Sequence, residues 1–133
     1  MRAYWYFVRP RTAGVKALLF HNGKVLFIRH SYTPKMWSLP GGGIKRDEDV
    51  LVALKREIWE ELGVEAKNFE YCGESNSNRE FKRDKVFVYR GELVSGEVKL
   101  DNIELIDAKW FAQNEISKLT PFTQAIVDLC LSN

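Results

Sequence analysis

The segment Pro40–Val64, PGGGIKRDEDVLVALKREIWEELGV, contains three adjacent glycines followed by residues with the pattern of a helix. Asp49 suits a helix N-terminus, because its side chain can accept hydrogen bonds from the first unpaired backbone N–H groups. Gly63 stands where the C-terminal cap belongs. No proline or glycine interrupts the residues between them. These signals predict a helix from about Val50 to Leu62.

Three glutamates lie beside the apolar face of this predicted helix. At about 100° per residue, Glu57 and Glu61 fall at the edge of the apolar stripe and Glu60 lies just beyond it. Like charges at these spacings repel, and more strongly near a core, where the effective dielectric is lower. Arg56, one turn before Glu60, can offset part of this charge. A divalent cation fits the whole cluster better, because Mg²⁺ and Mn²⁺ prefer oxygen ligands.

For a Glu-Glu pair alone, the alternative is a solvated acidic helix end. Here the surrounding residues form a longer motif, the Nudix box G-x5-E-x7-R-E-U-x-E-E-x-G-U, where U is a bulky aliphatic residue. All its specified positions are filled, by Gly42, Glu48, Arg56, Glu57, Ile58, Glu60, Glu61, Gly63 and Val64. The chain therefore resembles the Nudix hydrolases. The residues after the box carry no subfamily marker, so the resemblance does not select a substrate.

The resemblance implies hydrolysis of a nucleoside diphosphate linked to another group, with Mg²⁺ (or Mn²⁺) as the cofactor. Carried over position by position, it makes Glu57, Glu60 and Glu61 metal ligands, together with the backbone carbonyl of Gly41. The glycine run suits close approach of the backbone to a metal and phosphates. Its alternative is a flexible turn.

The resemblance also assigns two supporting residues. Glu48 becomes a ligand through water or a nearby supporting carboxylate, and Arg56 holds a box carboxylate by a charge-assisted hydrogen bond. Glu57 is the first choice for the base that takes the proton of the attacking water. Glu48 and a loop acid, Asp101 or Glu104, are the alternatives.

Residues outside the box suggest how a nucleotide-type substrate is bound. Arg79 and Arg83 belong to a cluster of basic residues that could pair with phosphates, and Trp37 could stack on a nucleobase. Each has a simpler alternative, a solvated basic hairpin for the arginines and packing for the tryptophan. Within the box, Asp47 stands where family members commonly carry glycine. We expect the turn to tolerate it, since Asp accepts left-handed conformations better than most residues.

The composition and the two cysteines bear on the number of domains, on membrane and DNA binding, and on the compartment of the protein. The 133 residues, 45% of them hydrophobic, suit one domain spanning 1–133. The apolar run at 3–8 is too short for a signal peptide, and no stretch reaches the roughly 20 apolar residues of a membrane span. A net charge of +2 gives no DNA-binding signature. Cys72 and Cys130 lack metal-site spacing, so we expect buried, reduced thiols and a cytoplasmic protein.

The rest of the chain predicts strands around two helices. Apolar runs at 15–20 and 24–29 flank Asn22-Gly23, a strong hairpin signal. Further strands are expected at 65–74, 85–92 and 104–111. Thr120 and Pro121 are expected to begin a last helix that runs to about Leu131. This order predicts an α/β (α+β) fold, and the resemblance implies a Nudix-type α/β/α sandwich with a central mixed sheet.

Two other functions use the same fold. A catalytically silent module could bind a nucleotide or a protein partner, and loss of Glu57 or Glu61 would favour it. Neither glutamate is lost. An isomerase or another enzyme of this fold is the third possibility, and the sequence shows no signature of the expected additional cysteine and glutamate chemistry.

Overall fold

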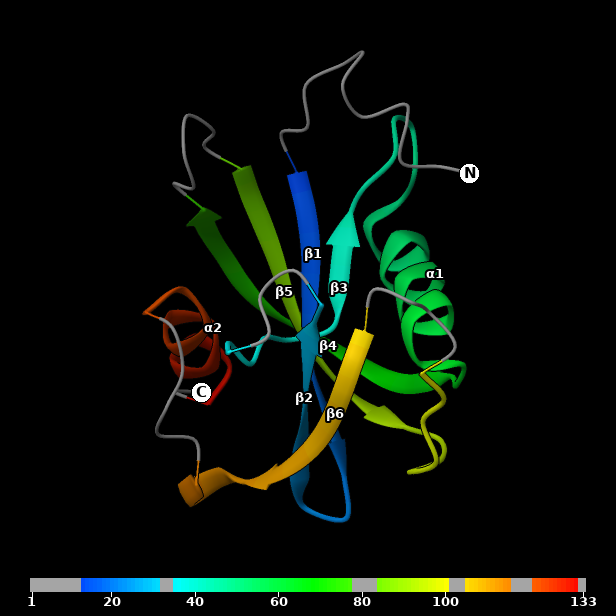
Figure 1. Cartoon of the computed structure of the whole chain (residues 1–133). Helices are drawn as coiled ribbons and strands as arrows, with labels where there is room; N and C mark the ends of the chain where they lie inside the picture. Colours follow the sequence, from blue (N-terminus) through cyan, green and yellow to red (C-terminus); the bar gives the residue numbers. More distant parts are fainter. Residues whose placement is uncertain (1–12, 32–34, 78–83, 101–104, 116–120, 132–133) are drawn as a thin grey trace.

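A mixed six-stranded sheet lies between two helices in the computed structural model (Figure 1). The structure describes residues 13–31, 35–77, 84–100, 105–115 and 121–131. The strands are β1 (Ala13–His21), β2 (Lys24–His30), β3 (Gly41–Gly43), β4 (Ala66–Ser77), β5 (Asp84–Leu93) and β6 (Leu105–Ala112). The helices are α1 (Val50–Leu62) and α2 (Pro121–Leu131), and a 3₁₀ turn covers Gln113–Glu115. The predicted sandwich with a central mixed sheet is confirmed.

The sheet has the order β4-β5-β1-β2-β6, with β3 paired to β1. β1 and β5 are parallel, and the other pairs are antiparallel. One edge of β1 is shared by two strands. β2 pairs with it near the Asn22-Gly23 turn, through Phe20 and Val25. β3 pairs with it nearer the N-terminal end of β1, through Val15 and Gly42. This division leaves the glycine strand beside α1 (Figure 1).

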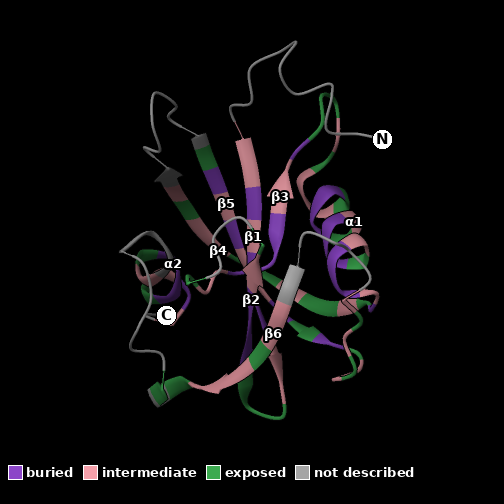
Figure 2. Ribbon diagram, in the orientation of Figure 1, coloured by how far each residue is buried: buried purple, intermediate pink, exposed green. Residues whose placement is uncertain are grey.

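Both faces of the central strands are buried (Figure 2). In β2, Leu26 and Ile28 belong to the core cluster that includes α1, whereas Val25 and Phe27 belong to the cluster that includes α2. This alternation follows from the two-residue period of a strand. It explains why β1 and β2 have nearly continuous apolar sequences, since a helix covers each face of the sheet.

Helix α1 begins and ends at the predicted residues. The Asp49 carboxylate accepts a hydrogen bond from the Leu51 N–H at 3.1 Å. Gly63 adopts the left-handed conformation with φ 67°, and its N–H donates to the Trp59 carbonyl at 2.9 Å. Local capping residues therefore determine the bounds of the helix that carries the box glutamates.

The glycine run is a strand and not a turn. In β3, Gly41 has φ 144°, and a Cβ atom placed there would lie 2.0 Å from the Val15 carbonyl oxygen. No side chain fits at that position, so glycine is needed for β3 to approach β1 this closely.

The other predicted elements agree with the structure within a few residues. Asn22 and Gly23 form the predicted hairpin turn, with φ 53° and 78°. Asp47 has φ 64°, so it adopts the left-handed conformation that we expected it to tolerate. The strand predicted at 65–74 extends to Ser77, and Thr120 lies outside the described residues. No helix in the described part of the chain is long and apolar enough to cross a membrane.

The expectation of two reduced thiols is wrong. Cys72 in β4 and Cys130 in α2 form a disulfide between residues 58 positions apart. Their spacing gave no signal, because only the packing of α2 against β4 brings them together. Cys130 is fully buried, as expected. The sequence argument for a cytoplasmic location loses its support from free thiols, and the location stays a prediction.

Reduction of this disulfide should destabilise the fold. Closing a loop of this length restricts the unfolded chain, so we expect dithiothreitol to lower the free energy of unfolding by about 2 to 4 kcal/mol. Urea unfolding with and without dithiothreitol measures this difference. The Cys72→Ser variant should resemble the reduced protein in both conditions. Two reactive thiols in the native protein, with no effect of the reductant, would show that the disulfide does not form.

Candidate active site

Two box glutamates are buried at the edge of the apolar face of α1. The exposed fraction is 6% for both Glu57 and Glu61, and Glu60 is half-buried. Ile58 and Leu62 on the same helix belong to the adjacent core cluster. The predicted position of the acids, beside the buried stripe, is therefore confirmed. Charged carboxylates are rarely this buried unless they are paired or bind a cation.

The glycine strand lies directly against these carboxylates. The Gly41 N–H donates to Glu61 Oε1 at 3.1 Å. A Cβ atom on Gly42 would lie 2.6 Å from the Glu57 carboxyl carbon, well inside normal contact. Glycine at this position is therefore necessary for the Glu57 carboxylate to occupy its place next to β3.

Arg56 connects the box acids to one another. Its guanidinium holds Glu48 with two hydrogen bonds, from Nε to Oε2 at 2.8 Å and from Nη2 to Oε1 at 2.9 Å. Nη1 donates to Glu57 Oε2 at 2.9 Å and to Glu60 Oε1 at 3.4 Å, and Nη2 donates to the Gly43 carbonyl at 3.1 Å. These five bonds match the five N–H donors of an arginine. The side chain thus fixes three carboxylates and β3 relative to one another.

The Arg56–Glu48 pair also shifts both acidities. The Arg56 guanidinium holds the pKa of the Glu48 carboxyl below its usual value of 4.5. The bond to Glu48 in turn raises the pKa of Arg56 further above its already high value. The Lys45 N–H also donates to Glu48 Oε1, at 3.0 Å. The turn that contains Asp47 therefore places Glu48 between a backbone donor and the guanidinium.

The lowered pKa of Glu48 predicts a pH-dependent contribution to stability. Because the folded-state pKa lies below the unfolded one, the contribution is complete above about pH 4.5 and is lost as the pH falls through the folded-state pKa. We expect Glu48→Gln to lower the free energy of unfolding by about 1 to 3 kcal/mol at pH 7. Urea unfolding at a series of pH values should show this difference shrinking toward pH 3. A difference that stays constant over the series would contradict the assignment.

The structure does not join all predicted substrate residues to this cluster. Trp37 packs in the core cluster that includes α2, where its ring meets Phe111 edge-on at 5.4 Å and the Arg29 guanidinium lies 4.8 Å above it. These contacts match its alternative role in packing, and nucleobase stacking stays a prediction. Arg79, Arg83, Asp101 and Glu104 lie outside the described residues.

Sequence reasoning missed Lys16, which contacts the segment that leads into the glycine strand. Its Nζ donates to the Leu39 carbonyl at 3.2 Å, two residues before Gly41. The signal that could have found it is a charged residue inside the otherwise apolar run of β1. A lysine at such a position needs a specific environment.

The donor chemistry of the cluster fits a hard divalent cation. Glutamate carboxylates and glycine carbonyls are the oxygen ligands that Mg²⁺ and Mn²⁺ prefer. The space that Gly42 leaves for the Glu57 carboxylate supports this fit. In the described part of the chain, however, no group of three or more His, Cys, Asp or Glu side chains is arranged to hold a metal ion.

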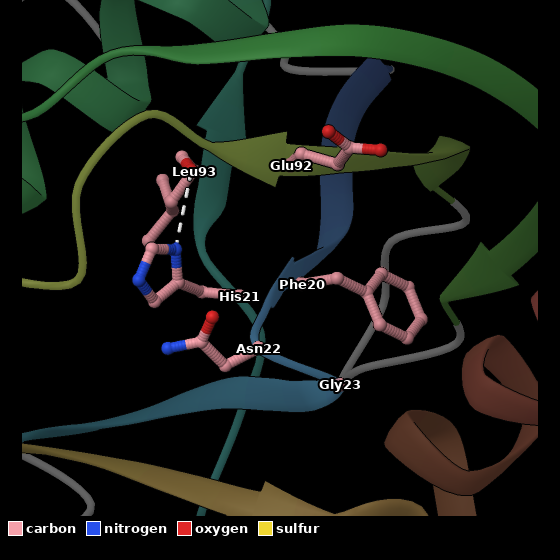
Figure 3. A pocket seen from close by; sticks show the side chains of 6 residues that line it. All are labelled: Phe20, His21, Asn22, Gly23, Glu92 and Leu93. Carbon is pink, nitrogen blue, oxygen red and sulfur yellow. Dashed lines mark hydrogen bonds between the residues drawn. The ribbon is translucent and has the colours of Figure 1, made fainter.

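Two surface hollows lie away from the box acids. One, of about 320 Å³, is lined by Lys55, Trp59, Glu65 and Ala66. The other, of about 240 Å³, lies at the β1–β2 turn (Figure 3). There His21 Nδ1 lies 3.4 Å from the Leu93 carbonyl oxygen, and the Glu92 carboxylate points away from the imidazole. Since neither hollow is lined by a box carboxylate, neither is a candidate for the active site.

Comparison with known proteins identifies the family. The sequence model of the NUDIX domain matches residues 10–130, and the chain belongs to the Nudix family. The NAD-capped RNA hydrolase NudC of Pseudomonas aeruginosa is 29% identical over 128 residues, which are 92% of this chain and 45% of that protein. Nudix hydrolase 19, chloroplastic, of Arabidopsis thaliana is 31% identical over 122 residues, 84% of this chain and 27% of that protein. The chain thus spans less than half the length of these relatives.

Solved structures give the same fold. The crystal structure of a MutT NUDIX hydrolase from Burkholderia pseudomallei superimposes with a TM-score of 0.79 at 27% sequence identity. The alignment covers 91% of this chain and 98% of that one. The agreement extends over nearly the whole of both chains.

Proposed function

We propose that this chain hydrolyses a pyrophosphate bond in a nucleoside diphosphate linked to another group, and that it requires Mg²⁺ or Mn²⁺. The observation that carries the proposal is the pair of buried carboxylates, Glu57 and Glu61, packed against the glycine strand. Burying two negative charges on successive turns of one helix is unfavourable without a cation. The Arg56 guanidinium supplies one positive charge to a cluster of four glutamates.

The metal would be held by the carboxylates of Glu57, Glu60 and Glu61 and by the Gly41 carbonyl. When bound, a divalent cation neutralises phosphate charge and lowers the pKa of a coordinated water. Arg56 holds two of these carboxylates in place through its bonds to Glu57 and Glu60. Its bidentate bond to Glu48 restricts the guanidinium to one orientation.

Glu57 remains the first choice for the base that accepts the proton of the attacking water. Both oxygens of Glu48 accept hydrogen bonds from Arg56, and its pKa is lowered, which makes Glu48 a poor candidate for the base. Asp101 and Glu104 stay as alternatives on the sequence argument alone.

For the substrate, we propose a nucleotide whose phosphates contact Arg79 and Arg83 and whose base stacks on an aromatic residue such as Trp37. The basic segment follows β4 in the sequence, and the aromatic residue precedes the glycine strand. Because the relative from Pseudomonas aeruginosa is an NAD-capped RNA hydrolase, NAD and NAD-capped RNA are included among the substrates to be tested.

A substrate panel tests the proposal. The purified chain is incubated with nucleoside triphosphates, nucleotide sugars, ADP-ribose, NAD, NAD-capped RNA and dinucleoside polyphosphates, with Mg²⁺ or with EDTA. We expect release of a nucleoside monophosphate or phosphate from at least one compound with Mg²⁺, and loss of this activity in EDTA that excess metal restores. Tight nucleotide binding without product release would favour the silent binding module, and activity that persists in EDTA would refute the metal requirement.

A further inference from the structure

Lys16 is a charged residue in the central strand of the sheet. Its neighbours Val15 and Ala17 are fully buried and belong to the core cluster on the α1 side. Successive side chains of a strand point to opposite faces, so Lys16 points to the α2 side. Its partner on β5 is Val88, which belongs to the core cluster on that side. Lys16 is half-buried there, and a charge in such a place is costly unless it has a function or a specific partner.

The lysine contacts the same short segment that the box acids contact. Its Nζ donates to the Leu39 carbonyl, and the Gly41 N–H donates to Glu61. Lys16 and Gly41 are also directly paired between β1 and β3. The ammonium group and the Glu61 carboxylate therefore hold positions only two residues apart on one backbone segment. Lys16 reaches this segment from the α2 face and Glu61 reaches it from α1, so a ligand that contacts both groups lies across β3.

From this arrangement we infer that Lys16 binds the diphosphate of the substrate. The inference rests on the proposed function, because it takes the substrate to be a nucleoside diphosphate derivative. The ammonium is a compact charge with three donors, which suits phosphate oxygens. The bond to Leu39 restricts the side chain before the ligand arrives, so less conformational entropy is lost on binding.

Binding of ADP in the presence of Mg²⁺ tests the inference by isothermal titration calorimetry, without turnover. We expect Lys16→Gln to weaken ADP binding by about 10- to 100-fold, the effect of losing a hydrogen bond to a charged group. Lys16→Arg should retain most of the affinity. The matched control is Lys24→Gln, which removes the same charge from an exposed residue at the start of β2 and should bind ADP like the wild type.

Titration of the same variants with Mn²⁺ alone separates phosphate binding from a structural role. If Lys16 only supported the segment around Leu39, Lys16→Gln would weaken Mn²⁺ binding as well, because Gly41 belongs to the proposed metal site. The inference predicts Mn²⁺ affinity that is unchanged or higher. It is overturned if Lys16→Gln binds ADP like Lys24→Gln, or if ADP and Mn²⁺ affinity fall together. If the wild type itself does not bind ADP with Mg²⁺, the inference is overturned, whereas the proposed function is decided by the substrate panel and its EDTA arm.

Discussion

Replacing Glu57 with glutamine should lower kcat by about a thousandfold, within the range observed for loss of a general base. The glutamine side chain has the same shape and can still accept the Arg56 hydrogen bond, but it cannot take a proton and is a weaker metal ligand. The fold should persist, because the change removes one of two buried negative charges on the same helix face. We therefore expect a free energy of unfolding equal to or above that of the wild type.

Two measurements on purified protein check this expectation. Kinetics are followed with saturating Mg²⁺ and the best substrate of the panel, and stability is followed by urea unfolding. Glu65→Gln is the matched control, since this residue is exposed just beyond α1 and should keep full activity. If Glu57→Gln kept more than about a tenth of the wild-type kcat, Glu57 would be neither the base nor a required ligand.

The second large effect is expected from Arg56→Met, which should lower the free energy of unfolding by about 3 to 5 kcal/mol. Methionine preserves much of the volume but removes all five hydrogen bonds of the guanidinium. Glu48 and Glu57 are then left without their cation in partly or fully buried positions. Leaving one partner of a buried ion pair uncompensated is costly, because the remaining charge stays desolvated.

Urea unfolding at pH 7 measures this loss. Arg46→Met is the control, since Arg46 is exposed in the turn before α1 and its replacement changes the net charge equally. Surface substitutions of this kind usually change stability by less than about 0.5 kcal/mol. Equal stability of the two variants would mean that the Arg56 network contributes little, and that the box acids are held in place by other contacts.

Local signals determined the parts of the fold that the sequence predicted well. The bounds of α1 follow from Asp49 and Gly63, which act within one turn of the helix. The hairpin at Asn22-Gly23 follows from residues that accept positive φ. In both cases the decisive interactions join residues close in the sequence, and residue type alone is informative.

Features that depend on long-range pairing were not predictable in this way. β3 is a strand because Gly42 pairs with Val15, and no local pattern distinguishes this from a flexible turn. The disulfide between Cys72 and Cys130 depends on where α2 packs, which the spacing of the cysteines does not reveal. The parallel pairing of β1 with β5 also joins residues far apart in the sequence, so no local pattern predicts it.

In the candidate site, too, the local spacing was predictable and the long-range contacts were not. Helical spacing placed Glu57, Glu60 and Glu61 on one side of α1, and the structure has them there. Arg56 was expected to hold one box carboxylate, and it contacts three of them together with the Gly43 carbonyl. The sequence did not predict the path of the turn before α1, which brings Glu48 back to Arg56. Helical periodicity carries no information about that path.

The central claim is that the glutamates of α1 hold a divalent cation, and Mn²⁺ binding tests it most directly. Electron paramagnetic resonance counts free Mn²⁺ during titration of the wild type, the Glu57→Gln and Glu61→Gln variants, and the Glu65→Gln control. The account predicts saturable binding to the wild type and the control, and affinity at least about tenfold weaker in the two variants, because each loses a charged ligand. Equal Mn²⁺ affinity in all four proteins, or no saturable binding to the wild type, would contradict it.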